Sequence, residues 1–103
     1  MTDTAAGGAK LVGPIIRGFD GELADAVAAA VERDNPGADV LVDDQGGYVR
    51  IHVRHRCVLN RATLEEELGR PFPLSELEPA LASFAGRVKQ TPDQTVWYLE
   101  RQD

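Results

Sequence analysis

The stretch Tyr48–Arg54, which reads YVRIHVR, decides how this chain folds. Val49, Ile51 and Val53 alternate there with one aromatic residue and three residues that can carry a positive charge. Successive side chains of a β-strand point to opposite faces, so the three β-branched residues line one face. The pattern predicts a half-buried antiparallel strand whose polar face is open to water or to a partner.

The segments around this strand predict further short strands. Residues 40–42 and the polar turn at 43–47 complete a hairpin with it. Residues 11–17 are rich in β-branched residues, but Pro14 has no N–H, which favours an edge position or an irregular strand. Residues 56–59 form another short strand, and residues 88–90 pair with 95–100 across the turn at 91–94.

One helix is strongly predicted between residues 20 and 34. Asp20 is a candidate N-cap, and the sequence Asn-Pro-Gly at 35–37 ends the helix. Its apolar residues recur at helical spacing on one face. They are Leu23, Ala26, Val27, Ala30 and Val31.

Two further helices are predicted from capping-box patterns. Thr63 with Glu66 starts the first, and Gly69 closes it as a left-handed cap. Ser75 with Glu78 starts the second, whose leucines and Phe84 follow helical spacing despite a bend at Pro79. The resulting order is β-α-β-β-β-α-α-β-β. We therefore expect an α+β fold with a mixed or antiparallel sheet packed with two to three helices.

Length and composition indicate one domain, residues 11–103, after a flexible tail at 1–10. The formal net charge of −6 over 103 residues speaks against nucleic acid as a partner. No apolar run approaches the ~20 residues of a membrane span, and no signal peptide is evident. Cys57, the single cysteine, fits a small core residue in a cytoplasmic protein. We expect a monomer.

The sequence lacks a catalytic or metal-binding set. His52 and His55 are expected on opposite faces of a strand, as surface residues rather than a metal pair. No phosphate-binding loop or nucleophile motif is present. We therefore predict a cofactor-free protein that acts by binding and is not an enzyme. Two alternatives stay open: a small-molecule-binding regulatory domain, and a small enzyme with one acid and one base.

Five segments, in collinear order between about residues 11 and 101, resemble a known family. They are 12–17 (VGPIIR), 34–37 (DNPG), 48–51 (YVRI), 63–72 (TLEEELGRPF) and 81–86 (LASFAG). The series is similar to the effector, or regulatory, proteins of bacterial multicomponent diiron monooxygenases. The nearest resemblance is to toluene monooxygenase effectors, with relatives in phenol hydroxylase and soluble methane monooxygenase.

The resemblance implies a protein without a cofactor that docks on the large hydroxylase subunit, which holds the diiron centre. Docking would adjust the active-site geometry, substrate access, turnover and regiospecificity of a toluene, aromatic or alkene hydroxylase. We expect the docking residues among exposed groups that local folding does not require. They are Asn35, Tyr48, Arg50, His52, Arg54, Ser83, Phe84 and Arg87. Competing expectations are a structural ion pair for Arg50 and core packing for Phe84.

Overall fold

The computed structural model describes residues 10–18 and 21–99. The predicted N-cap Asp20 and almost all of the predicted tail lie outside the described residues. The elements in chain order are β1 (Leu11–Arg17), α2 (Gly21–Asp34), β2 (Val40–Asp44), β3 (Tyr48–Arg54), β4 (Arg56–Asn60), α3 (Arg61–Leu68), the 3-10 helix η1 (Leu74–Ala80), β5 (Leu81–Ala85), β6 (Arg87–Gln90) and β7 (Gln94–Tyr98).

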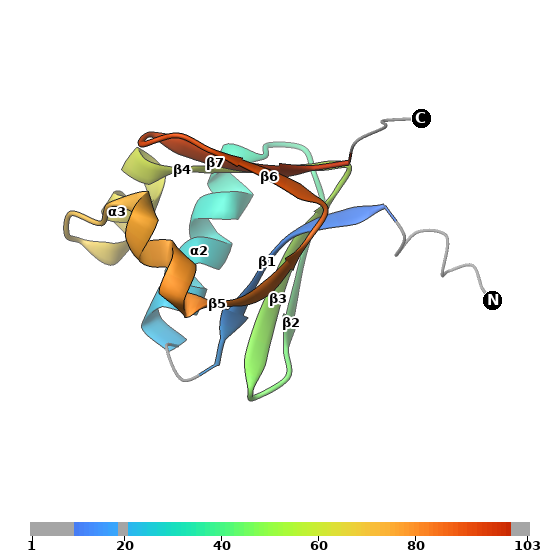
Figure 1. Cartoon of the computed structure of the whole chain (residues 1–103), viewed down its shortest axis with the longest axis horizontal. Helices are drawn as coiled ribbons and strands as arrows, with labels where there is room; N and C mark the ends of the chain where they lie inside the picture. Colours follow the sequence, from blue (N-terminus) through green and yellow to red (C-terminus); the bar gives the residue numbers. More distant parts are fainter. Residues whose placement is uncertain (1–9, 19–20, 100–103) are drawn as a thin grey trace.

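The strands form two antiparallel sheets. The four-stranded sheet has the order β2-β3-β1-β5, and the three-stranded sheet has the order β4-β7-β6. Figure 1 shows the three-stranded sheet at the top, the four-stranded sheet at the lower right, and the helices on the left of the space between them. The α+β prediction is confirmed, with two sheets in place of the single sheet that we expected.

The core lies between the two sheets and α2. Val49, Ile51 and Val53 of β3 are buried, as their alternation predicted. The predicted apolar stripe of α2 is also buried, together with Ala24. Trp97 of β7 is fully buried and adds the largest side chain to this core. The helix stripe consists of alanine, valine and leucine, so α2 can pack close to both sheets.

Pro14 does not lie in an edge strand. β1 pairs with β3 on one side and with β5 on the other, so the edge prediction is wrong. The predicted irregularity is found instead: the β1–β3 register skips Gly13 and Pro14, and the β1–β5 register shifts between Ile15 and Ile16. Gly13 has φ +143°, and a Cβ there would lie 2.2 Å from the carbonyl oxygen of Ile51. Only glycine allows this close approach of β1 to β3.

The chain crosses between the two sheets at two single-residue corners. His55 separates β3 from β4 with φ 72°, and its N–H donates to the carbonyl of Lys10 at 2.8 Å. Gly86 separates β5 from β6 with φ 93°, and a Cβ there would lie 2.8 Å from the carbonyl oxygen of Tyr98. The second corner therefore requires glycine.

The predicted third helix is wrong over its second half. Residues 74–80 form only the 3-10 helix η1, and Leu81 begins strand β5. Pro79 has no N–H for a helical hydrogen bond and its ring clashes with the preceding turn, which explains the early end. Phe84 and Ser83 therefore lie on a strand paired with β1.

Both predicted capping boxes are also absent from the described residues. α3 begins two residues before Thr63, whose hydroxyl donates to Asp34 Oδ1 at 2.7 Å. Ser75 lies inside η1, which begins at Leu74. The predicted C-cap is confirmed: Gly69 adopts the left-handed conformation, and its N–H donates to the carbonyl of Glu65 at 2.8 Å.

Candidate docking surface

The outer face of the four-stranded sheet gathers five of the eight predicted docking residues. Residues directly opposite each other in antiparallel strands share a face. Arg50 pairs with Ile15 of β1, which in turn pairs with Ser83 of β5. Tyr48 and Arg54 lie on the same side of β3 as Arg50, because their positions differ from it by two and four. By the same register Arg17 of β1 and Asp43 of β2 also belong to this face. It is therefore a polar surface with three arginines and one aspartate, beside the half-buried Leu11 and Ile15.

Arg50 and Arg54 are exposed on this face, and Tyr48 is half-buried. The Arg50 Cζ atom lies 5.5 Å from the centroid of the Tyr48 ring, so the guanidinium is held over an aromatic face. No carboxylate of the described residues lies within 4.0 Å of Arg50, so the expected structural ion pair is not found. A guanidinium without a carboxylate partner remains available for one on another protein.

His52 does not belong to the exposed set. It lies on the same face of β3, but only 7% of its surface is accessible, and Nε2 finds no hydrogen-bond partner within the described part of the chain. Burial lowers the pKa of His52, the charge of Arg50 lowers the pKa further, and a hydrogen bond with the Gly13 backbone opposes both. The close approach of β1 at Gly13 explains the burial. His55 is also only partly exposed, so the prediction of two surface histidines is wrong.

The Asn35 side chain forms hydrogen bonds that link α2 to β4. Its side-chain NH2 donates to the carbonyls of Val31 at 2.7 Å and Val58 at 2.9 Å. Its side-chain carbonyl accepts from the N–H of Val58 at 3.0 Å. The amide thus caps the end of α2 and satisfies the outward backbone groups of β4 in the manner of a neighbouring strand. The expectation that local folding does not require Asn35 is wrong.

Two further predicted residues, Phe84 of β5 and Arg87 of β6, flank the corner at Gly86. Ser83, Phe84 and Arg87 are exposed, and Phe84 has 40% of its surface accessible. The competing expectation of core packing for Phe84 is therefore wrong. Phe84 and Val88 line a groove of about 310 Å³ between β5 and the three-stranded sheet, with Trp97 also contributing to its wall.

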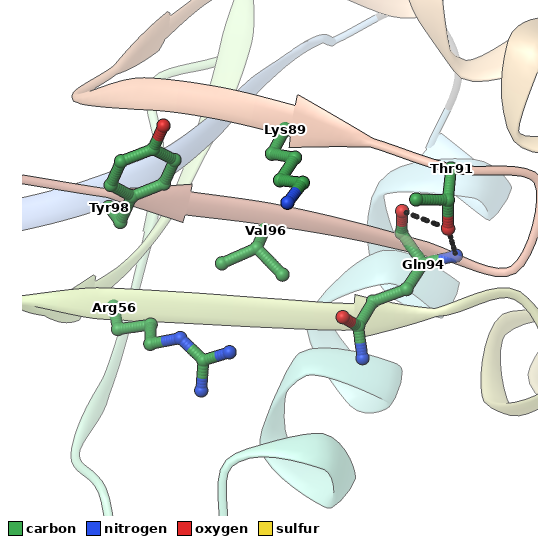
Figure 2. A pocket seen from close by; sticks show the side chains of 6 residues that line it. All are labelled: Arg56, Lys89, Thr91, Gln94, Val96 and Tyr98. Atoms are coloured by element: carbon green, nitrogen blue, oxygen red, sulfur yellow. Dashed lines mark hydrogen bonds between the residues drawn. The ribbon is translucent and has the colours of Figure 1, made fainter.

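The outer face of the three-stranded sheet is a second polar surface, which we did not predict. It carries a shallow hollow of about 590 Å³ lined by Arg56, Lys89, Thr91, Gln94, Val96 and Tyr98. Figure 2 shows Arg56 and Lys89 on either side of Val96, on the strands that flank β7. Their alternation with apolar residues in β4 and β6 was visible in the sequence. Pairing of these strands alone does not identify the surface; the face that each residue occupies does.

The described residues show neither a metal-type cluster nor a reactive thiol. Among residues 10–18 and 21–99, no three His, Cys, Asp or Glu side chains are grouped as a metal site would require. Burial and the charge of Asp34 raise the pKa of the Cys57 thiol to about 12. Cys57 is therefore a protonated core residue at neutral pH, as predicted. No described helix is long and apolar enough to cross a membrane.

Comparison with known proteins identifies relatives along most of the chain. The model described as the MmoB/DmpM family matches residues 10–98. The chain is 49% identical over 91 residues to the effector subunit of the alkene monooxygenase system of Xanthobacter autotrophicus strain Py2, covering 88% of each chain. It is 31% identical over 77 residues to the stimulatory component DmpM of phenol 2-monooxygenase from Pseudomonas sp. strain CF600, covering 75% of this chain and 83% of that protein.

Solved structures give a concordant result. A chain in a structure of the phenol hydroxylase–regulatory protein complex matches with a TM-score of 0.73 and 32% identity, over 87% of this chain and 99% of that one. A second structure of such a complex matches with a TM-score of 0.67 and 31% identity, over 85% and 98%. The soluble methane monooxygenase regulatory protein B shares the fold, with a TM-score of 0.63 at 18% identity over 88% of this chain and 66% of that one.

Proposed function

The chain belongs to the MmoB/DmpM family, and from this membership we infer that it is the effector of a bacterial multicomponent diiron monooxygenase. The observation that carries the inference is the 49% identity to an alkene monooxygenase effector subunit over 88% of the chain. In this role the chain is a regulatory component: it binds the hydroxylase and does not carry out the oxidation itself. We place this function in the cytoplasm.

An effector of this kind changes its partner by differential binding. It can shift the hydroxylase only as far as it binds one conformation better than another. A difference of ~1.4 kcal/mol changes the ratio of two conformations about tenfold. We propose that the active-site geometry, substrate access, turnover and regiospecificity of the hydroxylase respond to such a shift. The diiron chemistry belongs to the hydroxylase, and this chain contributes a surface without a cofactor.

For the docking face we propose the outer side of the four-stranded sheet together with the β5–β6 corner. The residues proposed to contact the hydroxylase are Tyr48, Arg50, Arg54, Ser83, Phe84 and Arg87. Support comes from the exposed arginines, from an exposed phenylalanine and from the enrichment of arginine and aromatic residues at protein interfaces. Asn35 and His52 are left out of this face. The Asn35 side chain is hydrogen-bonded to β4, and His52 is buried.

The proposal is tested by measuring affinity and turnover with the hydroxylase of the same organism. We expect wild-type protein to raise the turnover rate and to change the product ratio. Removing one interface charge, in Arg50→Gln or Arg54→Gln, should weaken binding by about tenfold or more, since buried arginine contacts often dominate an interface. Isothermal titration calorimetry gives the affinity, and product analysis gives the regiospecificity.

Arg33→Gln is the matched control. Arg33 is an arginine of α2 paired with Glu66 and Glu67, and it lies outside the proposed face. Its removal should leave hydroxylase affinity unchanged. If wild-type protein left turnover and product ratio unaltered, the effector function would be refuted. If it altered both while the Arg50 and Arg54 variants bound normally, only the assignment of the face would fail.

The substrate of the partner remains a prediction. The sequence resembles toluene monooxygenase effectors, whereas the relatives described above belong to alkene and phenol systems. Turnover of toluene, phenol and a short alkene by the reconstituted system would distinguish these three classes.

A further inference from the structure

Strand β6 leaves one side of its backbone unpaired within the described structure. It pairs with β7 alone and forms an edge of the three-stranded sheet. The N–H of Thr91 donates to the carbonyl of Gln94 at 2.8 Å, which fixes the alternation of the ladder. By that alternation Arg87 and Lys89 bond to β7, while the N–H and C=O groups of Val88 and Gln90 point away from it.

The other edges of the two sheets are less able to accept a strand. Asn35 occupies the outward groups of Val58 in β4, and Asp34 Oδ2 accepts from the N–H of Asn60 at 2.7 Å. β5 carries the register shift in its pairing with β1, and such irregularities disturb edge pairing. β2 has a regular edge but carries two adjacent carboxylates, Asp43 and Asp44. β6 is therefore the regular edge without a blocking side chain or a carboxylate.

The two faces beside the β6 edge differ in chemistry. On the outer face lies the hollow with Lys89 and Arg56, and by register no described residue of that face is acidic. On the inner face lies the groove lined by Val88, Phe84 and Trp97. The chain as a whole has a formal net charge of −6, so a basic outer face is a local departure from its composition.

We propose that β6 is a docking edge for an extended segment of a partner protein in which acidic and large apolar residues alternate. Such a segment would bond to the outward groups of Val88 and Gln90 and extend the three-stranded sheet. Because alternate side chains of a strand point to opposite faces, its carboxylates would meet Lys89 and Arg56, and its apolar residues would enter the groove. The inference goes beyond the proposed docking on the hydroxylase, because it concerns the backbone edge of β6. The two surfaces meet at Phe84 and Arg87, which belong to both.

A peptide provides the probe. We would titrate the full chain with a short capped peptide in which glutamates alternate with leucines and valines, and follow the fluorescence of Trp97, the only tryptophan. A second peptide of the same composition, with its acidic and apolar residues in separate blocks, is the peptide control. We expect the alternating peptide to bind at least about tenfold more tightly than the block peptide, with an affinity that falls as salt is added.

Matched proline variants test the edge itself. In Val88→Pro the outward N–H is lost while the β6–β7 bonds of Arg87 and Lys89 remain, so the fold should be retained. Binding should weaken about tenfold, because one hydrogen bond is lost and the ring obstructs the incoming strand. Val42→Pro is the control. The backbone N–H of Val42 points away from β3 at the β2 edge, and the residue is 45% exposed, against 42% for Val88. It should bind the peptide as wild type does.

Lys89→Glu tests the charged face without changing the backbone and should also weaken binding about tenfold. Three outcomes would overturn the proposal. They are equal binding of the two peptides, which would indicate a general anion site; unchanged binding in Val88→Pro with retained folding; and unchanged binding in Lys89→Glu. If Val88→Pro failed to fold, amide hydrogen exchange of the wild type would serve as the test. Peptide binding should slow the exchange of the Val88 and Gln90 amides, and unchanged exchange would overturn the proposal.

Discussion

The two edges of the three-stranded sheet differ in whether their outward backbone groups have hydrogen-bond partners. At β4, Asp34 at the end of α2 and the following Asn35 satisfy outward backbone groups of Asn60 and Val58 with hydrogen bonds of 2.7 to 3.0 Å. At β6, no described strand or side chain performs this task. Both edges carry polar groups of the same kind, so composition does not distinguish them. What differs is whether another part of the chain already occupies those groups.

The same contrast separates the docking candidates of the four-stranded sheet. His52 and Arg50 belong to one strand and one face, yet β1 covers His52 while Arg50 remains exposed. A polar side chain that is hydrogen-bonded inside the fold adds to stability, a covered one is held by the packing around it, and an exposed one can serve binding. Substitutions should therefore divide into two groups, with large effects on stability at the occupied positions and small ones at the open positions.

The largest effect is expected at the occupied edge. Asn35→Ala removes three hydrogen bonds and leaves the carbonyls of Val31 and Val58 and the N–H of Val58 without their partner. Unsatisfied groups in a partly buried site make such a loss expensive, so the free energy of unfolding should fall by about 2 to 4 kcal/mol. Urea denaturation followed by circular dichroism measures this change.

Gln45→Ala is the control for Asn35→Ala. Gln45 is an exposed amide in the β2–β3 turn, and its side chain donates only to Asp43. Its removal should change the unfolding free energy by less than about 0.5 kcal/mol. Equal losses in the two variants would mean that the occupied edge contributes no special stability.

A smaller, pH-dependent effect is expected at His52. Because the folded state lowers the pKa of His52, the unfolded state binds the proton more readily. The free energy of unfolding should therefore fall as the pH falls below about 6.5, the ordinary pKa of histidine, and keep falling until the folded pKa is passed. One proton limits the slope to about 1.4 kcal/mol per pH unit.

His52→Gln isolates this contribution. Urea denaturation of both proteins between neutral and mildly acidic pH gives the two slopes. The difference between wild type and variant should shrink as the pH falls, since only the wild type has a proton to gain at this position. A constant difference over the whole range would show that His52 does not titrate differently in the two states.

The parts of the fold that were predictable rest on local patterns. The apolar stripe of α2, the β2–β3 hairpin and the pairing of β6 with β7 follow from periodicity and turn residues close in the chain. The left-handed cap at Gly69 is equally local. Each of these features is decided within a few residues of where it is read.

The errors arose where a distant segment decides the outcome. Thr63 bonds to Asp34 across 29 positions in the chain and therefore does not cap its own helix. Pro14 tolerates an inner strand because the β1–β3 register skips it. The third helix is the exception, because its error is local. Pro79 ends the helix, although leucines on both sides of it follow helical spacing.

The docking candidates divide in the same way. The alternation of β3 correctly placed Arg50 and Arg54 on an exposed face. It could not show that Gly13 brings β1 over His52, because that approach joins residues far apart in sequence. Nor could it show that Asn35 meets β4, since this contact depends on how α2 packs. Whether a polar residue is free is a property of the tertiary fold.

The smallest effect is expected at the open edge, and it completes the comparison with Asn35. Lys89 is exposed, with no ion pair inside 4.0 Å among the described carboxylates. Lys89→Gln should therefore change the free energy of unfolding by less than about 0.5 kcal/mol in either direction, as for most surface substitutions. Removing the charge relieves weak repulsion from Arg56 but adds to the net negative charge, and salt screens both terms. A loss of more than about 1 kcal/mol in urea denaturation would mean that Lys89 already serves the fold, and β6 would then be an occupied edge like β4.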